Sequence, residues 1–357
     1  MIFPNLAVSR AARLRRALGA AAVALAACMA WALPAVAQAA GQLNLYCAYP
    51  DAAMCQALAN GFGARHGVKV SVVQKPTGEL YAQIKGEAGN PKGDLWWGGS
   101  GDSFLQAAQD GLLETYRSPQ LAQLAAWSLI QAEQSAYRSV GVYRAVMVLA
   151  YNTELLKKKK LAPPQCWRNL VDPIYKGEIE LSNPASSGTA YMMLATMAQL
   201  FGEDGAFRYL QQLHPSVTSY ARSGAGPLKA VARGEASIGV AMLHGVMTER
   251  ENGFPVAYTL PCEGTGAEAG SMAILRNARN LANARLFYDW ALGAEAQALP
   301  YSLKQYPLPA NRDIKLPPGM PDLAKAKFLD YDYAKFGSRE QHALLLGRWN
   351  KDVASAQ

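Results

Sequence analysis

The sequence predicts an α/β protein of two lobes. Short apolar stretches and amphipathic stretches alternate from residue 43 onward, and alternating strands and helices are typical of a mainly parallel sheet covered by helices. Two extended stretches, Val140–Tyr151 and Pro255–Leu260, flank a central block of shorter elements. We interpret them as two strands on which the chain crosses to a second lobe and returns.

The first elements follow from local patterns. Strict alternation over Val68–Val73 and the apolar stretch Asp94–Trp97 each predict a strand. Leu58 and Phe62 are four residues apart, which predicts a helix over Asp51–His66. The same reasoning predicts a strand over residues 43–46 and helices over residues 76–84 and 103–113.

A strand, a turn and a helix are predicted between residues 175 and 201. Ile179 and Leu181 are apolar positions of the strand, and Asn183 with Pro184 ends it. Ser186, Ser187, Gly188 and Thr189 then precede the helix. The N–H groups at a helix start are unpaired and carry partial positive charge, so small residues there can bind an anion. The alternative is that Ser186 or Ser187 simply caps the helix.

Composition limits the class of partner. The chain has 357 residues, 50% of them hydrophobic, and a formal net charge of +8. Four of these charges lie within residues 1–39, so removal of that segment leaves +8 minus +4, or +4. The only basic run, Lys157–Lys160, is expected at a helix end. A nucleic-acid partner is therefore not expected, because it would need clustered basic residues.

The N-terminus has the pattern of a targeting segment. A basic region up to Arg16 is followed by the apolar stretch Ala17–Leu33, and Ala37-Gln38-Ala39 has the small residues of a signal-peptidase site. We interpret residues 1–39 as a cleaved signal peptide and expect a periplasmic protein. The alternative is a lipoprotein acylated at Cys28, within Leu25-Ala-Ala-Cys28.

Four cysteines remain after residue 39. Cys47, Cys55, Cys166 and Cys262 form an even number, as expected of disulfides in an oxidising compartment. Cys47 and Cys55 are the local pair, and their pairing would leave Cys166 and Cys262. Three pairings are possible, and unpaired buried thiols are the alternative. No C-x-x-C spacing is present, so a zinc ribbon is not expected.

Further turns rich in glycine and hydroxyl residues follow predicted strands. Thr77 follows one strand, Ser100 and Asp102 stand in the turn after Trp97, and Ser223–Pro227 precedes a helix. Ligands of open α/β sheets bind at the carboxyl ends of the strands. Neither a complete G-x-G-x-x-G motif nor a P-loop is present, so a nucleotide cofactor is not expected.

The chain resembles the solute-binding proteins of bacterial ABC importers, which have the type II periplasmic fold. The branch it resembles binds ferric iron or hexose phosphates. The segments that carry this resemblance are Gly93–Gly99, Tyr151–Thr153, Cys166–Leu170, Pro173–Gly177, Asn183–Tyr191, Ala230–Glu235, Pro261–Gly266, Phe287–Trp290 and Glu295–Gln297.

The resemblance implies two lobes that close over a ligand. We expect residues 41–145 and 261–300 in one lobe, residues 146–260 in the other, and residues 301–357 packed across both. It also implies a non-enzymatic subunit that delivers a small anionic ligand to an ABC permease in the inner membrane. We expect it to act as a monomer without a cofactor.

Members of this branch bind one of two kinds of ligand, and they differ in the residues at the binding site. Iron-binding members have a tyrosine pair where this chain reads Gly239–Val246, which contains no tyrosine. Sugar-phosphate members are similar to this chain at His244 and Glu268, although the acid expected next to the histidine is Gly245 here. The expected ligand is therefore a sugar phosphate or a related phosphonate, and the alternative is Fe³⁺.

The predicted site combines the turns with the residues that the resemblance implies. Its ligand-binding residues are Thr77, Ser100, Asp102, Ser186, Ser187, Gly188, Thr189, Ser223, Gly224, Ala225, His244 and Glu268. The alternatives are a capping role for Ser100 and Asp102, a plain helix start at Ser223, and a packed histidine at residue 244. A secreted serine hydrolase using Ser187, His244 and Asp102 is a third hypothesis, but a G-x-S-x-G motif is lacking.

Overall fold

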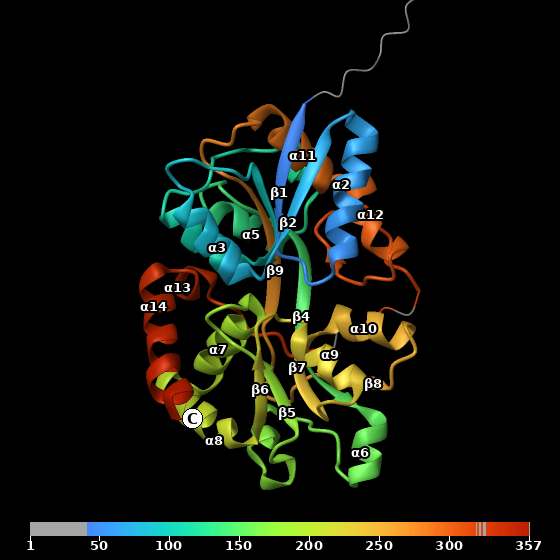
Figure 1. Cartoon of the computed structure of the whole chain (residues 1–357), viewed down its shortest axis with the longest axis vertical. Helices are drawn as coiled ribbons and strands as arrows, with labels where there is room; N and C mark the ends of the chain where they lie inside the picture. The colour runs from blue at the N-terminus through green and yellow to red at the C-terminus, as the bar shows by residue number, and fades with distance from the viewer. Residues whose placement is uncertain (1–40, 319, 321–322, 324–325, 357) are drawn as a thin grey trace, which may run out of the picture. The chain divides into compact units, whose positions relative to one another are not determined.

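One path of hydrogen-bonded strands runs through the fold, in the order β2-β1-β3-β9-β4-β7-β5-β6. Figure 1 shows the computed structural model, which describes residues 41–318, 320, 323 and 326–356. The predicted signal peptide and Cys28 lie outside these residues.

The first lobe is built on one end of this path. Its strands are β1 (Gln42–Cys47), β2 (Lys69–Gln74), β3 (Leu95–Ser100) and β9 (Ala267–Ile274). β1 pairs in parallel with β2 and β3, whereas β9 is antiparallel to β3. The helices of this part are α2 (Ala52–His66), α3 (Thr77–Gly86), α4 (Gly101–Gln109), α5 (Ala126–Gln134), α11 (Leu281–Leu292) and α12 (Ala294–Ser302).

The second lobe is built on the other end. Its strands are β5 (Ile179–Ser182), β6 (Val217–Ala221), β7 (Ile238–Met242) and β8 (Val256–Thr259). β5 pairs in parallel with β6 and β7. The helices here are α6 (Thr153–Lys159), α7 (Gly188–Phe201), α8 (Glu203–Leu213), α9 (Gly226–Arg233) and α10 (Leu243–Glu251).

The long strand β4 (Val140–Asn152) belongs to both lobes. Its first half pairs with β9 and with the short strand β10 (Leu308–Pro309), and its second half pairs with β7 and β8. Figure 1 shows β4 and β9 between the two groups of helices. Because its two halves pair with strands of different lobes, the two lobes share one continuous and almost fully buried strand.

The C-terminal segment contacts both lobes. It contains α13 (Tyr333–Phe336) and α14 (Arg339–Arg348). Arg339 pairs with Asp110 after α4, and Arg348 pairs with Asp204 of α8 at 2.8 Å. In the part of the chain that the structure describes, no helix is both long and apolar enough to span a bilayer.

Three predictions need correction. The sheet is mixed, because β4 and β9 run antiparallel to their neighbours. Pro255–Leu260 contains only the four-residue β8 at the side of β4, and the second long strand of the centre is β9, which we did not predict. Gly98–Ser100 belongs to β3 and is not a turn, and its two glycines, with φ values of +82° and +91°, lie where the pairing with β9 is irregular.

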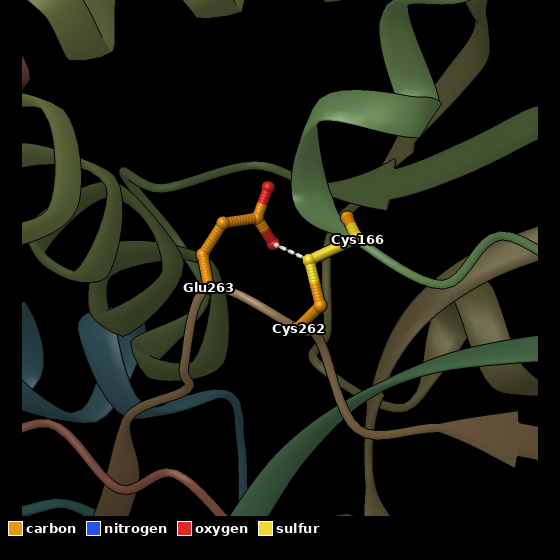
Figure 2. A group of neighbouring side chains, drawn as sticks. All are labelled: Cys166, Cys262 and Glu263. Atoms are coloured by element: carbon orange, nitrogen blue, oxygen red, sulfur yellow. Dashed lines mark hydrogen bonds between the residues drawn. A yellow bond between two sulfur atoms is a disulfide. The ribbon is translucent and has the colours of Figure 1, made fainter.

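Two disulfides link the four cysteines in the pairing that the local spacing favours. Cys47 bonds to Cys55, and Cys166 bonds to Cys262 over a separation of 96 residues. Figure 2 shows the second disulfide beside Glu263. The Glu263 carboxylate also accepts from the backbone N–H of Trp167 at 2.8 Å, so this loop is fixed by a covalent bond and by hydrogen bonds.

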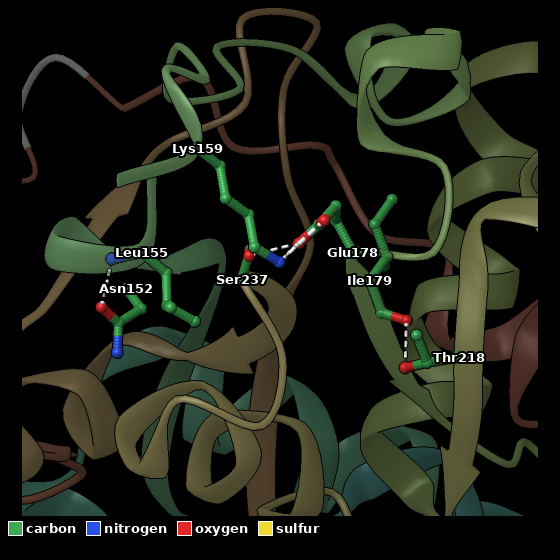
Figure 3. A network of polar contacts seen from close by, with 7 residues as sticks. All are labelled: Asn152, Leu155, Lys159, Glu178, Ile179, Thr218 and Ser237. Atoms are coloured by element: carbon green, nitrogen blue, oxygen red, sulfur yellow. Dashed lines mark hydrogen bonds and ion pairs between the residues drawn. The ribbon is translucent and has the colours of Figure 1, made fainter. Parts of the chain in front are cut away.

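A network of polar contacts links α6, β5 and β7 in the second lobe. Lys159, at the end of α6, donates to the Glu178 carboxylate at 2.6 and 2.8 Å, and Ser237 before β7 donates to the same group (Figure 3). Asn152 caps α6 by accepting from the N–H of Leu155 at 2.9 Å. α6 ends within the basic run Lys157–Lys160, so this run lies at a helix end, as predicted.

Candidate functional site

A cavity of about 200 Å³ lies where several helices begin. It is lined by the first residue of α3, Thr77, by the cap and first residues of α7, Ser187–Thr189, and by Ser223 and Gly224 just before α9. We call it the anion cavity. Three helix N-termini thus meet at one place, and each adds partial positive charge there.

Small residues permit this close approach. A Cβ atom at Gly188 would lie 2.7 Å from the Cβ of Ser100, and one at Gly224 would lie 3.2 Å from the Ser187 hydroxyl. The Ser187 hydroxyl also accepts from the N–H of Ala190 at 3.3 Å. Ser187 therefore caps α7 as the simpler interpretation states, and it lines the cavity as well.

His244 lines the same cavity from the start of α10. Its ring packs on Tyr49, with ring centroids 5.8 Å apart and an interplanar angle of 26°. Burial lowers the pKa of His244 to about 4, so the ring is neutral at pH 7. Its buried Nδ1 has no hydrogen-bond partner among the described residues, which leaves this atom free for a ligand.

Glu268 of β9 lines the cavity as a buried acid. Burial, with a smaller contribution from Asp102, raises the pKa of Glu268 to about 8. The side chain is therefore protonated at pH 7 and can donate a hydrogen bond as well as accept one. Its Oε2 lacks a partner within the described part of the chain.

Several residues of the cavity were not predicted. Tyr49 lies two residues after β1, Lys75 directly follows β2, and Tyr143 comes from the first half of β4. The Tyr143 hydroxyl accepts from the N–H of Gly99 at 3.1 Å. For Lys75 the available signal was its position at the carboxyl end of a strand, where ligands of such sheets bind.

A second cavity of about 210 Å³ adjoins the first, because Tyr49, Thr189, Gly224 and His244 line both. We call it the side cavity. Ala225, the cap of α9, lines only this one. Its other walls come from α9, from α10 and from Gln305.

Three predicted residues do not line either cavity. The Ser186 hydroxyl donates to the carbonyl oxygen of Arg222 at 2.7 Å. Ser100 is at the N-cap position of α4 but forms no capping hydrogen bond, and its hydroxyl donates to the Asp102 carboxylate at 3.3 Å. Asp102 is buried, and its carboxylate accepts from the Tyr331 hydroxyl at 2.8 Å. Burial raises the pKa of Asp102 to about 7. A role of these residues in binding stays a prediction.

The hydrolase hypothesis finds no support in these contacts. Asp102 is hydrogen-bonded to Tyr331 and Ser100, at 2.8 and 3.3 Å, and not to His244. The Ser187 hydroxyl is used as a helix cap. A catalytic triad would need hydrogen bonds from serine to histidine and from histidine to the acid, and none is present among the described residues.

Direct contacts between the two lobes lie next to the anion cavity. The N–H of Gly78, on α3, donates to the carbonyl oxygen of Ser186 at 3.2 Å. Next to it, the Glu79 carboxylate pairs with the Arg222 guanidinium, which lowers the pKa of Glu79. The helix starts of both lobes are thus held against each other, as expected of a cleft that encloses its ligand.

One cluster of potential metal ligands occurs among the described residues, formed by Cys166, Cys262 and Glu263. Figure 2 shows that the two sulfur atoms are bonded to each other. Because a metal binds thiolates, this oxidised pair does not provide a metal site. The cluster is also absent from the lining of both cavities.

Comparisons with known proteins agree on one family. The family model for bacterial extracellular solute-binding proteins matches residues 90–336. An uncharacterised protein of Haemophilus influenzae is 38% identical over 323 residues, which are 90% of this chain and 93% of that protein.

Two solved structures are similar over nearly their full length. The periplasmic binding protein AfuA of Actinobacillus pleuropneumoniae, with fructose-6-phosphate bound, is 39% identical with a TM-score of 0.84, over 88% of this chain and 99% of that chain. Iron-bound HitA of Pseudomonas aeruginosa is 22% identical with a TM-score of 0.73, over 86% of this chain and 98% of that chain. The second likeness concerns the fold alone.

Proposed function

This chain belongs to the family of bacterial extracellular solute-binding proteins, and we propose that it is the ABC-importer subunit that captures a sugar phosphate. Its fold is the two-lobed type II fold of periplasmic binding proteins, as predicted. The family acts outside the cytoplasm, where its members bind small solutes and deliver them to a permease.

The observation that carries this proposal is the meeting of three helix N-termini and two neutral side chains in one cavity. The N–H groups of Gly188 and Thr189, together with nearby hydroxyls, supply donors for phosphate oxygens. Neutral His244 and protonated Glu268 supply hydrogen bonds for sugar hydroxyls. The AfuA structure, with fructose-6-phosphate bound, supports the same ligand class.

Further parts of the proposal follow from the sequence. We propose that residues 1–39 are removed as a signal peptide, that residues 41–145 and 261–300 form one lobe and 146–260 the other, and that residues 301–357 pack across both. The protein acts as a monomer, without enzymatic activity, a cofactor or a nucleic-acid partner.

Ligand binding tests the proposal directly. The mature protein, refolded to remove any carried ligand, is heated in the presence of hexose phosphates, the matching unphosphorylated sugars, or chelated Fe³⁺. A ligand at about a thousand times its dissociation constant stabilises the folded state by roughly 4 kcal/mol. We expect stabilisation by a hexose phosphate and not by its sugar. Stabilisation by Fe³⁺ alone would contradict the proposal.

The variants Ser187→Asp and Ser187→Asn locate the phosphate. Aspartate and asparagine cap helices about as well as serine and differ little in size, so only the negative charge distinguishes them. At pH 7 we expect Ser187→Asp to weaken hexose-phosphate binding roughly a hundredfold relative to Ser187→Asn, since a fixed anion stands where the phosphate binds. Equal affinities of the two variants would show that the phosphate binds elsewhere.

A further inference from the structure

The anion cavity is small for the whole ligand of an importer. Small-molecule sites are typically about 300–1,000 Å³ in volume, whereas this cavity holds about 200 Å³. The adjoining side cavity holds about 210 Å³ and shares six wall residues with the first. Either cavity alone is below the usual range, and the two together are within it.

The side cavity differs from the anion cavity in the groups that line it. The apolar side chain of Leu228 lines only the side cavity, whereas Met242 and the ring of Tyr49 line both cavities. Hydrogen-bonding side chains also line only the side cavity, among them Glu249, Asn252 and Gln305. An apolar surface beside amide and carboxylate groups suits a sugar ring, which has apolar C–H faces and a rim of hydroxyls.

The charges of the side cavity favour a neutral group there. Lys229, Glu249 and Asp51 all line it, so both signs are present. The Asp51 carboxylate is already bonded to the Gln305 amide at 2.7 Å and caps α2. A second phosphate would meet these two acids, whereas an uncharged polyol can bond to the acids and the ammonium group alike.

Residue 245 keeps the side cavity open. Gly245 lies at the start of α10 and lines only this cavity. A Cβ atom on it would lie 2.9 Å from Cδ2 at the end of the Leu228 side chain, so an alanine fits after a small shift of Leu228, whereas a longer side chain would extend into the space between α9 and α10. The absence of a side chain at residue 245 is therefore what leaves room beside His244.

We propose that the solute is a phosphorylated disaccharide, bound with its phosphate and first ring in the anion cavity and its second ring in the side cavity. This inference rests on the proposed function, since the phosphate anchors the ligand. The second ring adds hydrogen bonds to Glu249, Asn252 or Gln305, and two such bonds correspond to roughly a tenfold gain in affinity.

Calorimetric titration of the refolded mature protein tests this inference. The probes are glucose 6-phosphate and a set of disaccharide monophosphates (trehalose, maltose and sucrose 6-phosphates), with trehalose as the unphosphorylated control. We expect at least one disaccharide phosphate to bind roughly tenfold more tightly than glucose 6-phosphate, and trehalose not to bind.

Variants of the side cavity test the position of the second ring. We expect Gly245→Met, which fills the cavity, to remove the preference for the disaccharide phosphate, while Gly245→Ala keeps it. Glu249→Ala is a second variant at a half-buried position without a hydrogen-bond partner among the described residues, and it should reduce the preference roughly threefold. Circular dichroism melting verifies that each variant folds.

The outcomes separate the two proposals. If glucose 6-phosphate binds as tightly as every disaccharide phosphate, or if Gly245→Met leaves the preference intact, the two-cavity inference is wrong and the proposed function stands. If no phosphate ester binds to the wild-type protein, the proposed function fails and this inference fails with it.

Discussion

Protonation of Glu268 should make the stability of the ligand-free protein depend on pH. Burial, with a contribution from Asp102, raises the pKa of Glu268 from 4.5 to about 8. The folded state then binds a proton that the unfolded state has released, so the free energy of unfolding falls as pH rises between these two values. The variant Glu268→Gln removes this proton and keeps the shape of the side chain.

The size of the effect follows from the two pKa values. From pH 7 to pH 9, the protonated fraction of Glu268 in the folded protein falls from about nine tenths to about one tenth, and in the unfolded chain it stays near zero. The free energy of unfolding should therefore decrease by about 1.4 kcal/mol over this range, the equivalent of one pKa unit. Asp102, with a folded-state pKa of about 7, adds a smaller decrease of about 0.4 kcal/mol over the same range.

Urea unfolding at pH 7 and pH 9 measures the effect. We expect the full loss in the wild-type protein and only the smaller loss due to Asp102 in Glu268→Gln. The matched control is Glu154→Gln, which makes the same change at an exposed position of α6 and should keep the wild-type dependence on pH. If Glu268→Gln loses as much stability as the wild type between pH 7 and pH 9, Glu268 is already ionised at pH 7, and its role as a hydrogen-bond donor is refuted.

Two further predictions concern the scaffold of the site. Replacing Cys166 and Cys262 together by serine should lower the free energy of unfolding by about 2–4 kcal/mol, because the bond closes a loop of 96 residues; non-reducing urea unfolding measures this, and an unchanged midpoint would contradict it. Gly99→Ala should destabilise by about 1–3 kcal/mol, since Gly99 has φ +91° and its neighbours leave no room for a Cβ atom. Gly86→Ala, where a Cβ atom meets open space, is its control in the same thermal melt.

Local sequence patterns were sufficient for the helix starts of the site. Ser187–Thr189 and Ser223–Gly224 could be predicted because small hydroxyl residues and glycine after a strand indicate a helix start, whatever the rest of the fold. The sequence left three pairings of the cysteines open, and the structure contains the local one, in which Cys47 of a strand bonds to Cys55 of the next helix.

The other walls of the cavity depend on the order of the strands. Tyr143 reaches the site because β4 lies beside β9, where Gly270 has no side chain and leaves space for the tyrosine ring. We did not predict β9 from the sequence, and without this strand no sequence pattern indicated that Tyr143 lies near Tyr49. The hydrogen-bond partner of Asp102 could not be predicted either. Its partner Tyr331 is 229 residues away, and no local pattern could indicate that the carboxylate points toward it.

The protonation of the cavity also bears on the choice between a sugar phosphate and ferric iron. Tyr49, Tyr143, His244 and Glu268 all line the anion cavity, and phenolates and carboxylates are ligands that Fe³⁺ prefers. However, burial raises the pKa of both tyrosines far above the usual value and the pKa of Glu268 to about 8. Iron could bind these oxygens only after three protons had left a buried site. A phosphate ester accepts hydrogen bonds from the same groups in the protonated forms that the fold already favours, and the helix N-termini compensate its charge.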